Sequence, residues 1–255
     1  MRQVVAKPLR MACSRWPHAM YALAGIAARV TIWAGRGSPE EWMRSHLPEL
    51  TPERAAKARA ENWAATLRFH VLVRAMSVEG GPSPFPRLVG GPDPASLRPP
   101  LILVTLHVGT PGALGGFLER LPGEVYAIQH GDWPENPSLP MPPFGHGQGH
   151  RAAIYGRALK TLRAGGFVFG AVDGDGAPVD VHILGRPRRI ARGLLAAARA
   201  TGAPLLPIAS RWRSNGIEVV AGEPIEPAGD EAMAGELVKW FDDFVRENPA
   251  ALQPY

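Results

Sequence analysis

The sequence has little cysteine and lacks several familiar catalytic motifs. Its single cysteine, Cys13, excludes an intramolecular disulfide and a metal site built from cysteine ligands. A reducing compartment fits this usage. No G-x-S-x-G elbow, no P-loop and no G-x-G-x-x-G after a strand occurs in the chain. The motif-based signatures of serine hydrolases, nucleoside triphosphatases and dinucleotide enzymes are therefore missing.

The N-terminus also lacks a long apolar run. The apolar stretch from Ala19 to Ala34 has 16 residues and contains Arg29, whereas a bilayer span needs about 20. Leu23, Ile26, Val30 and Trp33 recur at helical spacing and share one face. We interpret this stretch as a helix that lies at a membrane interface or packs on its own domain.

Charge and composition indicate which classes of binding partner suit the protein. Apolar residues make up 45% of the 255 residues, enough for a sizeable core in one large domain or two small ones. The net charge of +5 and the pI near 9.8 suit an anionic partner, such as a membrane surface or a phosphorylated substrate. No basic motif with interleaved aromatic residues is present, so nucleic acid is the least favoured partner.

Beyond residue 50, apolar runs of strand length alternate with helix-like segments. Continuous hydrophobicity, as in PLILVTL, predicts strands that are covered on both faces. The order predicts an α/β fold with a mainly parallel central sheet flanked by helices, preceded by N-terminal amphipathic helices. The expected strands are 100–106, 124–129, 167–173, 204–210 and 216–222, the expected helices are 51–76, 113–121, 151–166, 188–203 and 230–248, and the expected loops are 79–100 and 130–150.

Two polar residues follow buried strands. His107 ends one apolar run and Asp173 ends another, and the carboxyl ends of parallel strands share one sheet edge. A histidine there suits a general base beside exposed backbone N–H groups, or a structural hydrogen bond to a carbonyl. Asp173 and Asp175 form a D-G-D turn, which suits a metal site, as in some glycosyltransferases, an orienting carboxylate or an Asx turn.

Arginines cluster in GRPRRIARG. Arg186, Arg188, Arg189 and Arg192 lie within seven residues, and we expect them at the start of a helix. Because the helix dipole opposes cations there, an anionic ligand would stabilise the cluster. A solvated basic face is the alternative.

Taken together, several segments resemble the lysophospholipid acyltransferase superfamily, and within it the lipid A biosynthesis branch of late acyltransferases. LILVTLHVGTPGALGGFLERL resembles the family's buried strand that ends in a histidine followed by glycine. HRAAIYGRALKTLRAGG resembles an arginine and helix, with Arg151 at the arginine position, and FVFGAVDGDG resembles the strand with an Asp-rich turn. VDVHILGRPRRIARGLLAAARATGAPLLPI is the most specific match. The resemblance covers about Thr51 to Asn248.

The resemblance implies an α/β sandwich that transfers a fatty acyl group from acyl-carrier protein or coenzyme A to a lipid hydroxyl, in lipid A or another polar lipid. His107 would be the base, with no covalent enzyme intermediate, no metal and no cofactor beyond the thioester. Gly109, Arg151, Arg186 and Arg189 would be the substrate-binding residues, the arginines as contacts to anionic groups of the donor or the lipid.

The resemblance also implies an organisation and a location. Residues 1–50 would form a membrane-proximal helical segment, and residues 51–255 the acyltransferase-like domain. The protein would lie, peripherally or monotopically, on the cytoplasmic face of the inner membrane.

One position departs from the family pattern. The family has an acid five residues after the histidine, where this chain has Gly112. Three explanations follow: Asp173 or Asp175 supplies the carboxylate, His107 works alone and slowly, or the chain has lost the transferase activity and binds a lipid or a partner.

Overall fold

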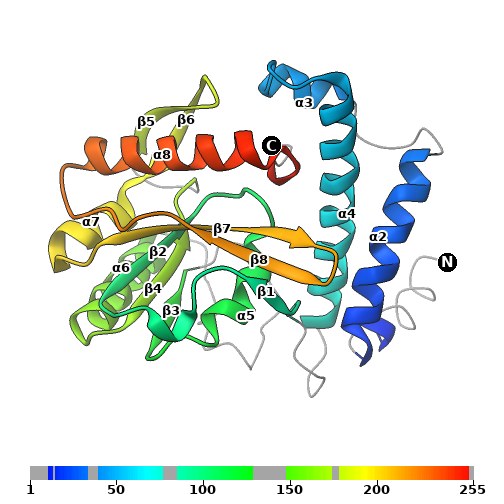
Figure 1. Cartoon of the computed structure of the whole chain (residues 1–255). Coiled ribbons are helices and arrows are strands. Elements are labelled where there is room, and N and C mark those ends of the chain that lie inside the picture. The colour runs from blue at the N-terminus through cyan, green and yellow to red at the C-terminus, as the bar shows by residue number, and fades with distance from the viewer. Residues whose placement is uncertain are drawn as a thin grey trace.

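The computed structural model describes residues 11–13, 15–33, 40–76, 85–128, 148–173 and 178–252. Its centre is a six-stranded sheet in the order β1-β8-β7-β2-β4-β3 (Figure 1). The β7–β8 pair is antiparallel, and the other four neighbouring pairs are parallel. The predicted α/β fold with a mainly parallel sheet is confirmed. The strands are β1 (Leu88–Gly90), β2 (Leu101–Thr105), β3 (Val125–Ala127), β4 (Phe167–Ala171), β7 (Leu205–Arg213) and β8 (Gly216–Ala221).

Helices cover both faces of this sheet. All five residues of β2 are buried; Ile102 and Val104 face the core under α6, α7 and α8, whereas Leu101 and Leu103 face the core under α2, α4 and α5. Alternate side chains of a strand point to opposite faces, so the continuous apolar run marks a strand covered on both. The helices are α2 (Pro17–Trp33), α3 (Glu40–His46), α4 (Pro52–Met76), α5 (Gly115–Leu118), α6 (Gln148–Arg163), α7 (Arg192–Thr201) and α8 (Asp230–Glu247), with 3₁₀ turns η1 (Pro94–Ser96), η2 (Pro111–Leu114) and η3 (Pro249–Ala251).

The proline-rich segment 79–100, which its composition predicts to be a loop, contains a short strand. Residues 88–90 form β1, which pairs in parallel with β8 at the edge of the sheet. The expectation of a loop is wrong for these three residues. Prolines and glycines on both sides end the strand, and the short apolar run pairs only because β8 offers it an open edge.

A second, two-stranded sheet lies beside the central one. β5 (Pro178–Ile183) and β6 (Arg186–Ala191) form an antiparallel hairpin. Leu184 and Gly185 make its two-residue turn with φ of 51° and 72°, the left-handed conformation that such turns require. Asp242 of α8 accepts a hydrogen bond from the Leu184 N–H at 2.9 Å, which fixes the turn to that helix.

This hairpin overturns one prediction. The expected helix from residue 188 begins only at Arg192, the first residue of α7. Arg186, Arg188 and Arg189 therefore lie on strand β6, and their placement at a helix start is wrong. Pairing with β5 across the Leu184–Gly185 turn, together with the hydrogen bond that holds this turn on α8, outweighs the helical tendency of residues 188–191.

The N-terminal helix α2 runs along α4 (Figure 1). Tyr21 and Ala24 are buried against the second core, whereas Leu23, Ile26 and Val30 are 55%, 57% and 58% exposed. One face of α2 thus docks on the protein, and an apolar face stays open to solvent. The side chain of Trp33 lies outside the described residues. Among the helices of the described ranges, none is both long and apolar enough to cross a bilayer.

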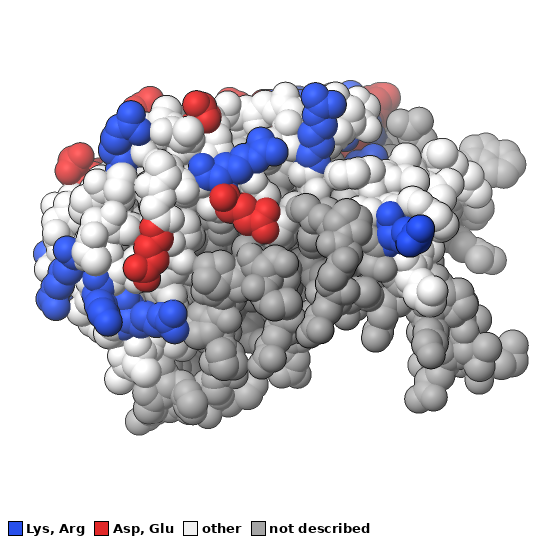
Figure 2. All heavy atoms as spheres, turned by 90° about the horizontal axis from the view of Figure 1, so that it is seen from below, with Lys and Arg blue, Asp and Glu red and all other residues white. Residues whose placement is uncertain are grey.

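Charges of both signs share the underside of the molecule. In Figure 2, Lys and Arg side chains gather at one edge, and elsewhere on the face they are interspersed with Asp and Glu. On the described part of this face, the excess positive charge is therefore not gathered into one continuous basic surface.

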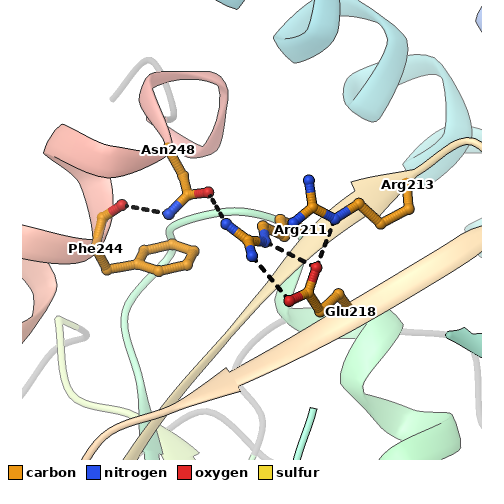
Figure 3. A network of polar contacts seen from close by, with 5 residues as sticks. All are labelled: Arg211, Arg213, Glu218, Phe244 and Asn248. Carbon is orange, nitrogen blue, oxygen red and sulfur yellow. Dashed lines mark hydrogen bonds and ion pairs between the residues drawn. The ribbon is translucent and has the colours of Figure 1, made fainter. Parts of the chain in front are cut away.

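A polar network ties the β7–β8 hairpin to the end of α8 (Figure 3). Arg211 donates from Nε and from one terminal nitrogen to the two oxygens of Glu218, at 3.1 and 2.8 Å, and its other terminal nitrogen donates to Asn248. Asn248 donates in turn to the carbonyl of Phe244 at 2.9 Å. Hydrogen bonds from Arg211, and to a smaller extent from Arg213, lower the pKa of Glu218 to about 2. Strand β7 is thereby a fixed support for what lies on its other face.

Candidate functional site

His107 and Asp173 follow two neighbouring strands, β2 and β4, and therefore lie at the same edge of the sheet. Thr105 of β2 is in register with Ala171 of β4 in a parallel pair. Two residues beyond each strand end stand His107 and Asp173. Equal offsets from a parallel register bring the two side chains together, as the sequence pattern predicts.

Both oxygens of Asp173 bind His107. Oδ1 lies 2.9 Å from the ring Nδ1, and Oδ2 accepts a hydrogen bond from the His107 backbone N–H at 2.9 Å. An ionised carboxylate only accepts hydrogen bonds, so the proton of the neutral ring belongs on Nδ1. Nε2, on the opposite edge of the ring, then carries the lone pair that can take a proton. The carboxylate is thus held at two points and sets the tautomer of the imidazole.

The contact with Asp173 changes the pKa of His107. The hydrogen bond that the His107 ring donates to Asp173 raises the pKa of His107 above its ordinary value of 6.5, and partial burial opposes that rise. The His107 side chain is 53% exposed and that of Asp173 is 19% exposed. The acid is therefore shielded, whereas the histidine ring stays within reach of a ligand.

The carboxylate that contacts His107 belongs to Asp173, beyond the end of β4. Gly112 lies in η2 and has no side chain to offer. Of the two aspartates that the sequence suggests, Asp175 lies outside the described residues. Its contribution stays a prediction.

The backbone conformation and the packing at position 109 require glycine. Its φ is +65°, its N–H donates to the carbonyl of Ala251 at 2.7 Å, and a Cβ at this position would lie 2.1 Å from the carbonyl oxygen of Ser210. Only glycine fits this close approach of the loop to β7. Its expected contact with substrate stays a prediction.

A cavity of about 1080 Å³ opens beside the pair. This volume is at the upper end of what small-molecule sites have. Its walls near the sheet are mostly apolar and come from β4, the end of β3, α8 and the C-terminal segment; they include Ile128, Phe169, Phe241, Val245 and Leu252. The hairpin β5–β6 adds a set of polar side chains to the lining, namely Asp180, His182, Arg186, Arg188 and Arg189.

The predicted anion contacts have different surroundings. Arg186 donates to the carbonyl of Ser45 at 2.9 Å, which joins the hairpin to α3. Arg189 lies 3.5 Å from Asp180 in an exposed ion pair. Arg151 lies in α6, and its side chain is outside the described residues. The structure therefore brings Arg186 and Arg189 to the cavity that holds His107.

Several supporting residues have no motif in the sequence. Thr110, Ser210 and Asp242 hold the His107 loop and the hairpin through contacts over 58 to 100 positions. The alternation of Val179, Val181 and Ile183 before a Leu-Gly pair is the pattern that indicates the hairpin in hindsight. In the part of the chain that the structure describes, no three His, Cys, Asp or Glu side chains are grouped to hold a metal ion.

Comparison with known proteins adds a structural likeness. No protein-family model matches the chain, and no curated protein matches it. The fold is similar to the crystal structure of the 1-acyl-sn-glycerophosphate (LPA) acyltransferase PlsC from Thermotoga maritima. The alignment covers 96% of this chain and 99% of that chain, with 14% sequence identity and a TM-score of 0.41. At these values the likeness assigns no activity to this chain.

Proposed function

We propose that the protein is a membrane-associated acyltransferase that moves a fatty acyl group from a thioester to a hydroxyl of a lipid A-like or other polar lipid. The observation that carries this proposal is the His107–Asp173 contact of 2.9 Å beside a largely apolar cavity. The pair provides a base with a fixed tautomer, and the cavity offers apolar walls against which an acyl chain can pack.

In the proposed reaction the acceptor hydroxyl attacks the thioester carbonyl carbon directly. Nε2 of His107 takes the hydroxyl proton as the new C–O bond forms, and the carbonyl electron pair moves to oxygen. Asp173 stabilises the imidazolium through Nδ1–H. The tetrahedral intermediate then expels the thiolate as the C–S bond breaks, and the thiolate takes the proton from Nε2. The products are an ester and a free thiol, and the histidine is neutral again.

The arginines give the proposal its polar contacts. Arg186 and Arg189 line the cavity beside the base, and Arg151 lies in the first turn of α6. We propose that these arginines bind the anionic groups of the donor or of the lipid head group, since guanidinium binds phosphate and carboxylate well. Acyl-carrier protein and coenzyme A both fit this assignment, and both carry phosphate.

The location follows from α2. Its exposed Leu23, Ile26 and Val30 form an apolar face, and the chain is basic overall. Such a face inserts at the level of the lipid head groups while the rest of the protein stays outside the hydrocarbon. We propose peripheral binding at the cytoplasmic face of the inner membrane, where acyl thioesters and lipid acceptors meet.

A thioester-consumption assay tests the proposal. Wild-type protein is incubated with acyl-CoA or acyl-carrier protein donors and a panel of polar lipids that carry a free hydroxyl. We expect turnover that His107→Ala reduces to background. His70→Ala, which removes an exposed histidine of α4, is the matched control and keeps wild-type turnover. Equal background rates for wild type and His107→Ala with every donor and acceptor would refute the proposed acyltransferase activity.

A second candidate is a non-catalytic lipid-binding or complex-forming protein of the same fold, and Gly112 in the place of the family acid favours it. It predicts that the cavity retains an acyl lipid with no ester formed. Mass spectrometry of lipid bound to the purified protein, set beside the turnover assay, separates the two.

A further inference from the structure

The loop that carries His107 is held from a second side, independent of Asp173. The backbone N–H of Thr110 donates to the hydroxyl of Ser210 at 3.2 Å, and the same hydroxyl donates to the carbonyl of Thr110 at 2.9 Å. One side chain of β7 thus satisfies both backbone groups of one loop residue. Thr110 and Ser210 are 3% and 2% exposed, so water does not replace these bonds easily.

A third bond comes from the next residue on the same face of β7. Trp212 donates from its indole Nε1 to the Thr110 hydroxyl at 3.0 Å. The indole is itself held from outside: the Tyr21 ring of α2 lies 5.2 Å away, centroid to centroid, and the Arg68 guanidinium of α4 lies 5.2 Å from its centroid. The support of the loop therefore extends through Trp212 to both N-terminal helices.

The rest of the loop leaves little room for movement. Gly109 packs so closely on the Ser210 backbone that no Cβ fits, and its N–H binds the carbonyl of Ala251. On its other side β7 is fixed to α8 by the Arg211 network. Movement of the loop at Thr110 would break three hydrogen bonds to Ser210 and Trp212, and Thr110 and Ser210 are buried.

We propose that Ser210 and Trp212 are positioning residues that keep the His107 ring in register with Asp173. The inference rests on the proposed function for its catalytic meaning. Because position 112 is glycine, no carboxylate of this loop can bind the histidine. The Ser210 hydroxyl and the Trp212 indole of β7 instead fix the position of the loop through Thr110.

The test compares variants that each remove one side chain's hydrogen bonds to Thr110. Ser210→Ala removes both bonds to the Thr110 backbone, and Trp212→Phe keeps an aromatic ring against Tyr21 and Arg68 but loses the indole donor. Thr201→Val is the matched control: the Thr201 hydroxyl also donates to one backbone carbonyl, of Ala197, and accepts from one N–H, of Ala203, but it lies at the end of α7.

Two measurements are made on each variant. The pKa of the His107 ring is followed by NMR of histidine-labelled protein, with His107→Ala to assign the signal. Turnover is followed against pH with the donor and acceptor pair that gives the highest rate in the wild type. We expect Ser210→Ala to lower kcat by roughly 10- to 100-fold with KM little changed, because small misplacements of a base cost that much. We expect the ring pKa to fall toward 6.5, and a smaller change of the same sign in Trp212→Phe.

Ring pKa values equal to wild type in folded Ser210→Ala and in Trp212→Phe overturn the proposal. If Ser210→Ala does not fold, Trp212→Phe decides alone by the same readout. Thr110→Val removes the same indole bond from the other end, so its combination with Trp212→Phe is expected to be non-additive; additive losses contradict the proposal. Absence of turnover in the wild type refutes the proposed function, whereas the NMR titration still tests the positioning role.

Discussion

At the scale of single residues, the site depends on one carboxylate that serves two donors. Asp173 binds the ring and the backbone N–H of His107 together, so it fixes the position of the histidine as well as its tautomer. A carboxylate at position 112 would approach from within the same loop. Here the acid follows the neighbouring strand, and Gly112 is the second residue of the short helical turn η2 beside the cavity.

Asp173→Asn tests this directly. The amide keeps the shape but loses the charge that stabilises the imidazolium and fixes the tautomer, so we expect kcat to fall by up to about 10⁴-fold. The base acts when neutral, so activity rises with pH through the pKa of His107. Since the bond to Asp173 raises that pKa, the midpoint of kcat/KM against pH is expected above 6.5 in the wild type and lower in the variant.

Asp243→Asn removes an exposed carboxylate of α8 and serves as its control, with no change in rate or midpoint expected. A midpoint that is the same in the wild type and in Asp173→Asn would contradict a raised pKa caused by this contact.

At the scale of elements, strand ends and hairpins build the site. The ends of β2 and β4 meet because parallel strands in register end together. The hairpin β5–β6 reaches the cavity because its turn is bound by Asp242 and its second strand by Ser45. The hairpin β7–β8 supports the His107 loop. Glu218 joins its two strands through Arg211, and the bond from Arg211 to Asn248 holds the hairpin on the end of α8.

The Glu218 network has a stability that depends on pH. The pKa of Glu218 is about 2 in the folded protein and 4.5 for an ordinary glutamate, so the stabilisation is present above pH 4.5 and is lost as the pH falls toward 2. We expect Glu218→Gln to lower the free energy of unfolding at pH 7 by about 1–2 kcal/mol, the range for charge-assisted hydrogen bonds that are partly exposed. Urea unfolding at pH 7 and at pH 3 measures it.

The gap between wild type and Glu218→Gln is expected to narrow at pH 3. Glu236→Gln, at an exposed position of α8, is the control and is expected to have no such gap. A gap that stays constant between pH 7 and pH 3 shows that the charge of Glu218 does not stabilise the hairpin.

At the scale of the whole molecule, the described residues leave apolar surface uncovered at the cavity wall beside His107 and on the outer face of α2. Both suit an enzyme that takes acyl chains from a thioester to a lipid in a membrane. The division into residues 1–50 and 51–255 stays a prediction, although α2 packs closely on α4.

The outer face of α2 is tested by the triple substitution Leu23→Gln, Ile26→Gln and Val30→Gln. These side chains are more than half exposed, so we expect little change in the melting temperature. Each substitution removes roughly 1 kcal/mol or more of the free energy of transfer of a side chain into an apolar phase. Partition of the protein onto anionic vesicles is therefore expected to fall by about 100-fold. Vesicle co-sedimentation measures it. Unchanged partition, there and on deletion of residues 1–35, means that α2 is not the membrane contact.

The sequence by itself determined the layers and the edge of the site. The apolar runs of β2 and β4 are local patterns, and each places a polar residue just past its end, so His107 and Asp173 could be predicted to meet. It also indicated α2 as a helix with an apolar face, because that face is a matter of spacing within one segment.

Only the tertiary structure decided how these parts are held. The bonds from Ser210 and Trp212 to Thr110 join positions about 100 residues apart, and the bond that holds the β5–β6 hairpin on α8 joins Leu184 to Asp242, 58 residues apart. Contacts of this kind depend on which segments the fold brings together. A hydroxyl or an indole has no recognisable spacing in the chain, and its partner is set by the packing of the sheet rather than by its neighbours in sequence.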